Sequence, residues 1–255
     1  MHLTTVGTGT VSPSATRVCA GHLVTTANVS VLFDCGSGVV HRLARAGADW
    51  TTITHVAITH FHPDHLSDLA FLLFAWRYGA AQPRTVPIDI VGPPGIDALL
   101  TRFAAAFGSW VREPGYPVRV SEVSPGAGVE LASGVQLSTF KVPHTEESVA
   151  YDLVHSGRRV VYTGDTGFDE GLGRWAAGCD LLLAECSLPD DREMAIHLTP
   201  RRCGELAAIA RPRVLVLTHF YPPVEDVDIR GIVRERFDGT LVLAEDGWSM
   251  EIEER

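Results

Sequence analysis

The sequence is poor in positive charge. It has 21 Lys and Arg residues against 31 Asp and Glu residues, which gives a formal net charge of −10. A surface that binds a nucleic-acid backbone neutralises phosphates with Lys and Arg, so this balance argues against a large nucleic-acid interface. The sequence also lacks an apolar run long enough to span a membrane and the pattern of a signal peptide. We therefore expect a cytoplasmic protein with no membrane partner.

Cysteine pairs, repeats and linkers are missing too. The five cysteines form no CxxC pair, and an odd, scattered set is typical of reduced thiols in a cytoplasmic protein. No fixed-period repeat, low-complexity tract or evident linker divides the chain, so we expect residues 1–255 to form a single domain. Short strand-like runs alternate with helical patterns, including a long helix from about Asp64 to Tyr78. This alternation predicts an α/β protein with layered sheets and flanking helices.

Histidine, by contrast, is concentrated in one place. The stretch "ITHFHPDHLSDL", residues 58–69, contains His60, His62, Asp64 and His65 directly after an apolar run. On extended backbone His60 and His62 leave the same face, while Asp64 and His65 lie on the turn into the next helix. A lone histidine is usually an ordinary surface or core residue, but this spacing is typical of metal ligands. One segment can thus serve two adjacent metal positions.

Four ligands cannot complete two metal sites, so further ligands must come from elsewhere in the chain. His144, Asp165 and His219 each follow an apolar run, as expected of residues at strand ends over a crevice. Asp165 lies between Gly164 and Gly167, which free the backbone to bring its carboxylate inward. Together with the first motif these residues make a candidate set of seven.

These motifs resemble the metallo-β-lactamase fold superfamily, in the branch that contains ribonuclease Z and related phosphodiesterases. The resemblance spans nearly the whole chain, from "VGTGTVSPSATR" through "LFDCGSG" (residues 32–38) to "LTHFYP" (residues 217–222). It implies an α/β fold, the αβ/βα four-layer sandwich, in which two mixed β-sheets are flanked by helices and the site lies along one edge.

The resemblance also implies how the ligands are divided. One metal takes three histidines: His60, His62 and His144. The second takes a mixed set: Asp64, His65 and His219. Asp165 bridges both metals together with a hydroxide that attacks the substrate, and Asp64 counts among the catalytic residues as well. Two Zn²⁺ ions per chain are expected, with Mn²⁺ or Fe²⁺ as alternatives.

Two further residues point to the chemistry of the leaving group. Glu185 ends the apolar run "LLLAE", and His197 precedes a helix. In the ribonuclease Z branch an acid and a histidine at these places form a pair in which the acid orients the histidine near the leaving oxygen. Both could instead be structural residues. Phe61 and Tyr221, beside predicted ligands, are candidates to line the substrate pocket.

The predicted function is dinuclear zinc-dependent hydrolysis of a phosphodiester, either a small molecule or a short RNA end. Ribonuclease Z grips tRNA with a long arm, but only 21 positions separate His144 from Asp165, where short forms carry it. One hairpin fills this interval, so tRNA binding is in doubt. The alternatives are a true tRNA 3′-processing endonuclease and an acyl hydrolase that cleaves a thioester, lactone or β-lactam. The family resemblance also suggests a homodimer.

Overall fold

Short runs of β-branched and aliphatic residues form two seven-stranded sheets in the computed structural model, which describes residues 1–253. The first sheet has the order β14 (Trp248–Glu251), β1 (His2–Gly7), β2 (Gly21–Thr25), β3 (Ser30–Phe33), β4 (His55–Ala57), β5 (Ile88–Gly92) and β6 (Val118–Glu122). The second has the order β13 (Thr240–Leu243), β12 (Val214–Thr218), β11 (Leu181–Glu185), β10 (Arg158–Tyr162), β9 (Val149–His155), β8 (Val135–Lys141) and β7 (Gly128–Ala132).

Both sheets are mixed, and they follow the same pairing scheme. Neighbouring strands run antiparallel from β14 to β3 and from β7 to β10. They run parallel from β3 to β6 and from β10 to β13. Each sheet thus has a half whose strands all end at one edge, as parallel strands must.

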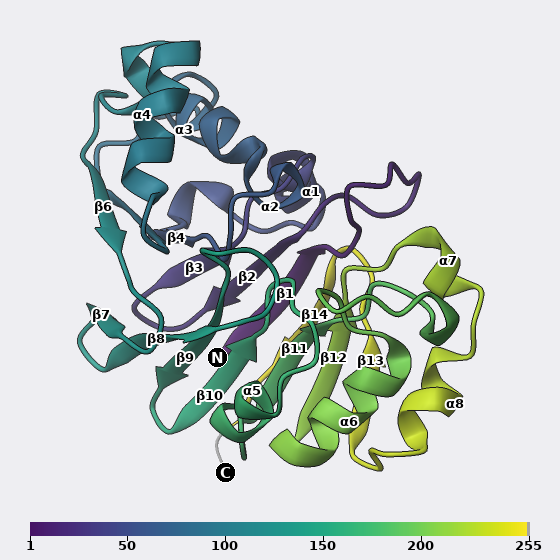
Figure 1. Cartoon of the computed structure of the whole chain (residues 1–255). Coiled ribbons are helices and arrows are strands. Elements are labelled where there is room, and N and C mark those ends of the chain that lie inside the picture. Colours follow the sequence, from purple (N-terminus) through teal and green to yellow (C-terminus); the bar gives the residue numbers. More distant parts are fainter. Residues whose placement is uncertain (254–255) are drawn as a thin grey trace.

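Helices cover the outer faces and make the four layers of the predicted sandwich (Figure 1). The first sheet carries α1 (Val39–Arg45), α2 (Pro63–Leu66), α3 (Asp68–Tyr78) and α4 (Ile96–Phe107). The second carries α5 (Glu170–Trp175), α6 (Pro200–Ala210), α7 (Pro222–Glu225) and α8 (Ile229–Arg234). Three 3₁₀ turns complete the elements: η1 (Trp50–Thr52), η2 (Ser109–Val111) and η3 (Asp190–Arg192). None of the described helices is long and apolar enough to cross a membrane.

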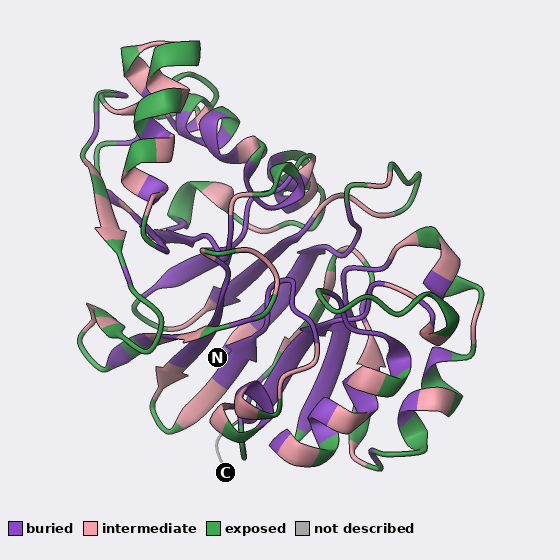
Figure 2. Cartoon of the chain, in the orientation of Figure 1, coloured by how far each residue is buried: buried purple, intermediate pink, exposed green. Residues whose placement is uncertain are grey.

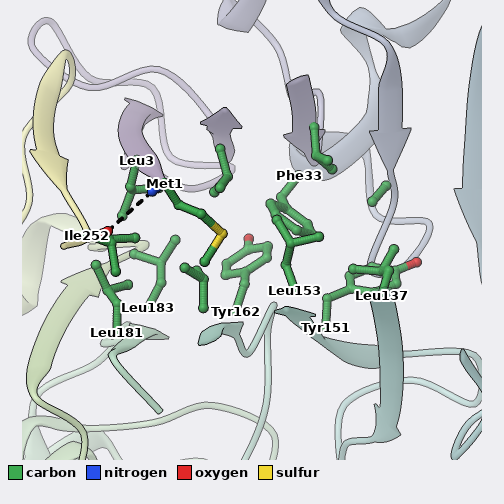
Figure 3. Packing of buried hydrophobic residues seen from close by; sticks show 14 of the residues in the cluster. Met1, Leu3, Phe33, Leu137, Tyr151, Leu153, Tyr162, Leu181, Leu183 and Ile252 are labelled. Carbon is green, nitrogen blue, oxygen red and sulfur yellow. Dashed lines mark hydrogen bonds between the residues drawn. The ribbon is translucent and has the colours of Figure 1, made fainter. Parts of the chain in front are cut away.

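The main core lies between the two sheets. Figure 3 shows side chains of both sheets meeting there, among them Phe33 from β3 and Tyr151 from β9. The Tyr151 hydroxyl donates to the Ile58 carbonyl at 2.8 Å and so ties the second sheet to the segment that follows β4. Each sheet also has one outer core, where it packs against its helices. The buried faces of these helices turn inward in Figure 2.

The prediction of one long helix from Asp64 to Tyr78 is wrong in one respect, because the helix is interrupted at Ser67. The Asp68 N–H donates to the Cys35 carbonyl at 2.9 Å instead of continuing the helical ladder. The Asp68 carboxylate in turn accepts the N–H groups of Gly38 and Val40 at the start of α1. The break fastens the histidine-rich segment to the loop after β3.

The interval between His144 and Asp165 holds only the β9–β10 hairpin, as the sequence predicted. Its turn residues, Ser156 and Gly157, have φ values of 50° and 74°, which suit a tight two-residue turn. Because β8 and β10 both run antiparallel to β9, they point the same way and their carboxyl ends meet at one edge. That edge is where the predicted site residues gather.

Candidate metal centre

Four of the seven candidate ligands form one group at this edge. His60 and His62 follow β4, His144 follows β8 and Asp165 follows β10, and one ligand atom of each lies within 4.8 Å of the others. His62 Nδ1 is 3.1 Å from His60 Nε2 and 3.1 Å from His144 Nε2. Asp165 Oδ2 lies 3.7 Å from His144 Nε2. His62 is exposed, so this group is open to solvent on one side.

The remaining three form a second group on the other side of Asp165. Ligand atoms of Asp64, His65 and His219 lie within 4.8 Å of one another. Asp165 Oδ1 is 3.3 Å from Nε2 of His65 and 3.3 Å from Nε2 of His219. Asp64 Oδ2 lies 3.5 Å from His219 Nε2. Asp165 therefore turns one oxygen toward each group, and the structure brings all seven predicted residues together.

Hydrogen bonds on the far side of the rings fix two of the histidine tautomers. His65 Nδ1 is 2.8 Å from the Asp34 carboxylate, and His144 Nδ1 is 3.0 Å from the Ile196 carbonyl. Both partners can only accept, so each Nδ1 must carry the hydrogen. The neutral ring then turns the lone pair of Nε2 into the cluster.

Two hydroxyl groups fix two more tautomers by the same logic. Thr59 Oγ1 donates to Asp34 at 2.9 Å, so it accepts from His60 Nδ1 at 3.0 Å. Ser187 Oγ donates to the Glu185 carboxylate and accepts from His219 Nδ1 at 2.9 Å. Each hydroxyl has one hydrogen to give, which is already used on a carboxylate. Nε2 of both histidines consequently presents a lone pair as well.

This arrangement fits a metal and little else. Nε2 of His65 and Nε2 of His219 face one another across 3.3 Å, and two lone pairs at that distance repel unless positive charge lies between them. Asp165 Oδ1 is buried and has no hydrogen-bond partner among the described residues, although buried polar atoms are nearly always paired. Imidazole nitrogens with carboxylate oxygens are the ligand set of zinc, and also suit manganese or iron.

The electrostatics of the cluster favour a cation. Burial opposes the ionised form of Asp165, but His219 and His65 outweigh it and hold the pKa of Asp165 well below its usual range. Burial also opposes charge on His65, yet Asp165 and Asp34 raise its pKa well above the usual value. The carboxylates that would keep a proton on His65 would equally hold a metal ion in its place.

Unusual backbone conformations aim two of these side chains. A Cβ on Gly167 would lie 1.8 Å from the Ala195 carbonyl oxygen, and Gly164 has a φ of +56°. The two glycines predicted to free Asp165 are thus both required by its backbone. His219 itself has a φ of 59°, a conformation that a histidine adopts rarely and that often marks a functional position.

The predicted pair of Glu185 and His197 also meets at the cluster. Glu185 Oε1 lies 3.0 Å from His197 Nδ1, and a ring nitrogen of His197 is within 4.8 Å of the ligand atoms of Asp165 and His219. Burial disfavours a charged His197, but the hydrogen bond and the charge of Glu185 outweigh it and raise its pKa to about 9. Tyr221 lies nearby, its ring centre 6.2 Å from that of His197.

The sequence pattern does not single out the residues behind the ligands. Asp34 falls within "LFDCGSG", and no motif marks Thr59 or Ser187 as functional. Asp34 accepts from Thr59, His65 and the Tyr162 hydroxyl, at 2.8–3.1 Å. The available signal was an acid directly after the apolar strand "SVLF", which is the same signal that identified the ligands.

The chain is similar to proteins of one known family. The family model described as the β-lactamase superfamily domain matches residues 30–220. A ribonuclease Z of Mycobacterium sp. (strain KMS) is 30% identical over 279 aligned positions, which cover 99% of this chain and 96% of that protein. The alignment is longer than the 255 residues of this chain, so the relative carries segments that this chain lacks.

Solved structures show the same fold. The short form of human tRNase Z is 25% identical with a TM-score of 0.82, and the match covers 99% of this chain and 100% of that one. The metallo-β-lactamase fold protein YhfI from Bacillus subtilis is 23% identical with a TM-score of 0.83, and covers 98% of both chains.

The Asp34 carboxylate yields a prediction. In an Asp34→Asn variant, an amide NH₂ would face the donors His65 Nδ1–H and Tyr162 O–H, while the φ of 56° still suits Asn. We expect zinc affinity, measured by competition with a chelator, to fall roughly 10- to 100-fold. The exposed Asp238→Asn is the control. Affinity equal to that of the unchanged protein would show that Asp34 does not orient the ligand.

Proposed function

The chain belongs to the β-lactamase superfamily, in its ribonuclease Z-like branch, and is a metal-dependent hydrolase. From this premise we propose that it cleaves phosphodiester bonds with two zinc ions. The observation that carries the proposal is the pairing of Glu185 with His197 at 3.0 Å beside the seven-residue cluster. A hydrolase needs an attacking water, stabilisation of developing negative charge and a proton for the leaving group.

The cluster supplies places for both metals. His60, His62 and His144 would hold one ion, Asp64, His65 and His219 the other, and Asp165 would contact both with its two oxygens. Ions bound there supply Lewis-acid chemistry, because they lower the pKa of water and take up charge on phosphoryl oxygens. The anionic Asp64 lies at the second position, where it would reduce the net positive charge of the bound ion and its ligands. An all-nitrogen first group with one shared carboxylate suits redox-silent zinc.

His197 and Glu185 would serve the leaving group. Glu185 holds Nδ1 of His197 and is itself held by the Thr166 N–H at 2.6 Å, so the imidazole orientation is fixed. The opposite nitrogen, Nε2, is left to donate a hydrogen bond or a proton to the departing oxygen. Phosphodiester cleavage requires this donation because an alkoxide is a poor leaving group.

The substrate is proposed to be a small phosphodiester or a short RNA end. The hairpin between His144 and Asp165 has only two turn residues, which leaves no arm there to hold tRNA. The net charge of −10 likewise disfavours a long polyanion. The similarity to ribonuclease Z makes tRNA 3′ processing the second candidate.

The leaving-group role is tested by His197→Ala. The variant should retain its metals, because His197 belongs to neither predicted ligand set. It should hydrolyse a dinucleoside monophosphate, whose leaving group is an alkoxide, roughly 10²- to 10⁴-fold more slowly, and bis-p-nitrophenyl phosphate much less so because p-nitrophenolate leaves without a proton. His155→Ala, on the distant turn of the β9–β10 hairpin, is the control. Full activity of His197→Ala on the dinucleoside monophosphate would refute the role. If the unchanged protein cleaved nitrocefin, a lactone or a thioester but no phosphodiester, the proposed reaction would be wrong.

We also propose that the chain is a homodimer whose contact includes the outer face of α3. Phe71, Phe74 and Tyr78 follow helical spacing and are 46%, 41% and 59% exposed. Phe74 contacts Tyr78 and Trp110, with ring centres 4.6 and 4.8 Å apart, so the aromatic surface is continuous. Apolar patches of this kind are typical of protein interfaces.

Sedimentation velocity tests the dimer. The protein should sediment with twice its chain mass of 27.6 kDa, and Phe74→Glu should sediment as a monomer because it places a charge at the centre of the contact. Val11→Glu, at an exposed apolar side chain on the loop after β1, should remain dimeric. A monomeric unchanged protein would contradict the proposal.

A further inference from the structure

A pocket of about 350 Å³ opens at the same edge of the sheets as the metal centre, because its lining residues follow β4, β5, β6 and β8. It is lined by Phe61, Pro94, Pro125, Glu146 and Glu147. Phe61 lies between two candidate ligands in the chain, and the two glutamates follow His144 closely. The volume is at the small end of the range for ligand sites, so it suits one flat group rather than a folded RNA.

The ring of Phe61 is held as a fixed wall of this pocket. It packs against Gly95, where a Cβ would lie 3.1 Å from the ring and where φ is +107°, so a side chain is doubly disfavoured there. The Gly95 N–H donates to Glu122 at 2.9 Å, which fastens the backbone behind the ring. An aromatic face bordered by prolines is a stacking surface for a planar ligand.

The glutamates give the same pocket a row of acceptors. Glu147 Oε1 accepts the Phe61 N–H at 3.4 Å, a long hydrogen bond that leaves most of the carboxylate available. Lys141 carries the nearby positive charge that acts on both glutamates, but its ammonium donates to backbone carbonyls within residues 142–148. A carboxylate can only accept, so the pocket favours a planar ligand with N–H donors and disfavours an anion.

We propose that this pocket binds the nucleobase attached to the scissile phosphodiester, and that Glu147 selects guanine. Guanine presents N1–H and N2–H₂ side by side, which match the two oxygens of one carboxylate. Adenine and cytosine offer one amino group at their pairing edge, and uracil flanks its N–H with carbonyls that a carboxylate repels. The inference rests on the proposed phosphodiesterase function and adds the substrate class to it.

The experiment compares p-nitrophenyl phosphodiesters of guanosine, adenosine, cytidine and uridine with the base-free bis-p-nitrophenyl phosphate. The kcat/KM of the guanosine ester should exceed that of the uridine ester about 10- to 100-fold, the discrimination expected of one bidentate pair. Glu147→Gln should collapse the guanosine-to-uridine ratio toward one. Glu113→Gln, which removes an exposed carboxylate elsewhere, should leave that ratio as it is.

Phe61→Leu separates stacking from hydrogen bonding. It should raise KM for all four nucleoside esters relative to the base-free ester, with less effect on the ratio between bases. If the protein cleaves the base-free ester but treats the four bases alike, or keeps its preference in Glu147→Gln, this inference is overturned while the proposed function stands. If no phosphodiester is cleaved at all, the proposed function fails first.

Discussion

The structure depends on one electrostatic constraint: five imidazole rings and two carboxylates converge on a small volume. Four of the five rings are turned inward by a hydrogen bond on the far side, so the convergence is built into the fold rather than left to flexible side chains. Asp165 shows the constraint most clearly, because its buried Oδ1 lacks a hydrogen-bond partner among the described residues. Metal ions bound there would pair with these nitrogen and oxygen atoms.

Two equivalent relays support this centre from the two sheets. His60 donates to Thr59 and Thr59 to Asp34 in the first sheet, while His219 donates to Ser187 and Ser187 to Glu185 in the second. The second relay has an additional branch, because Glu185 also binds His197. The residue that orients a candidate ligand therefore also orients the candidate proton donor, which couples metal binding to leaving-group chemistry.

The sequence was informative about the site because its residues follow apolar strands, and carboxyl ends of parallel strands meet at one edge. That rule placed His144, Asp165 and His219 with the histidine-rich segment. It could not reveal partners that depend on tertiary contact, such as the hydrogen bonds of Asp34. Nor could it show the break at Ser67, because the competing acceptor for the Asp68 N–H is the distant Cys35 carbonyl.

We propose that the cluster holds two metal ions, one on either side of Asp165. Crystals of the zinc-saturated protein, measured on both sides of the zinc absorption edge, test it directly. We expect two anomalous peaks per chain, one beside His60, His62 and His144 and one beside Asp64, His65 and His219. A single peak, or none in this cluster, would contradict it.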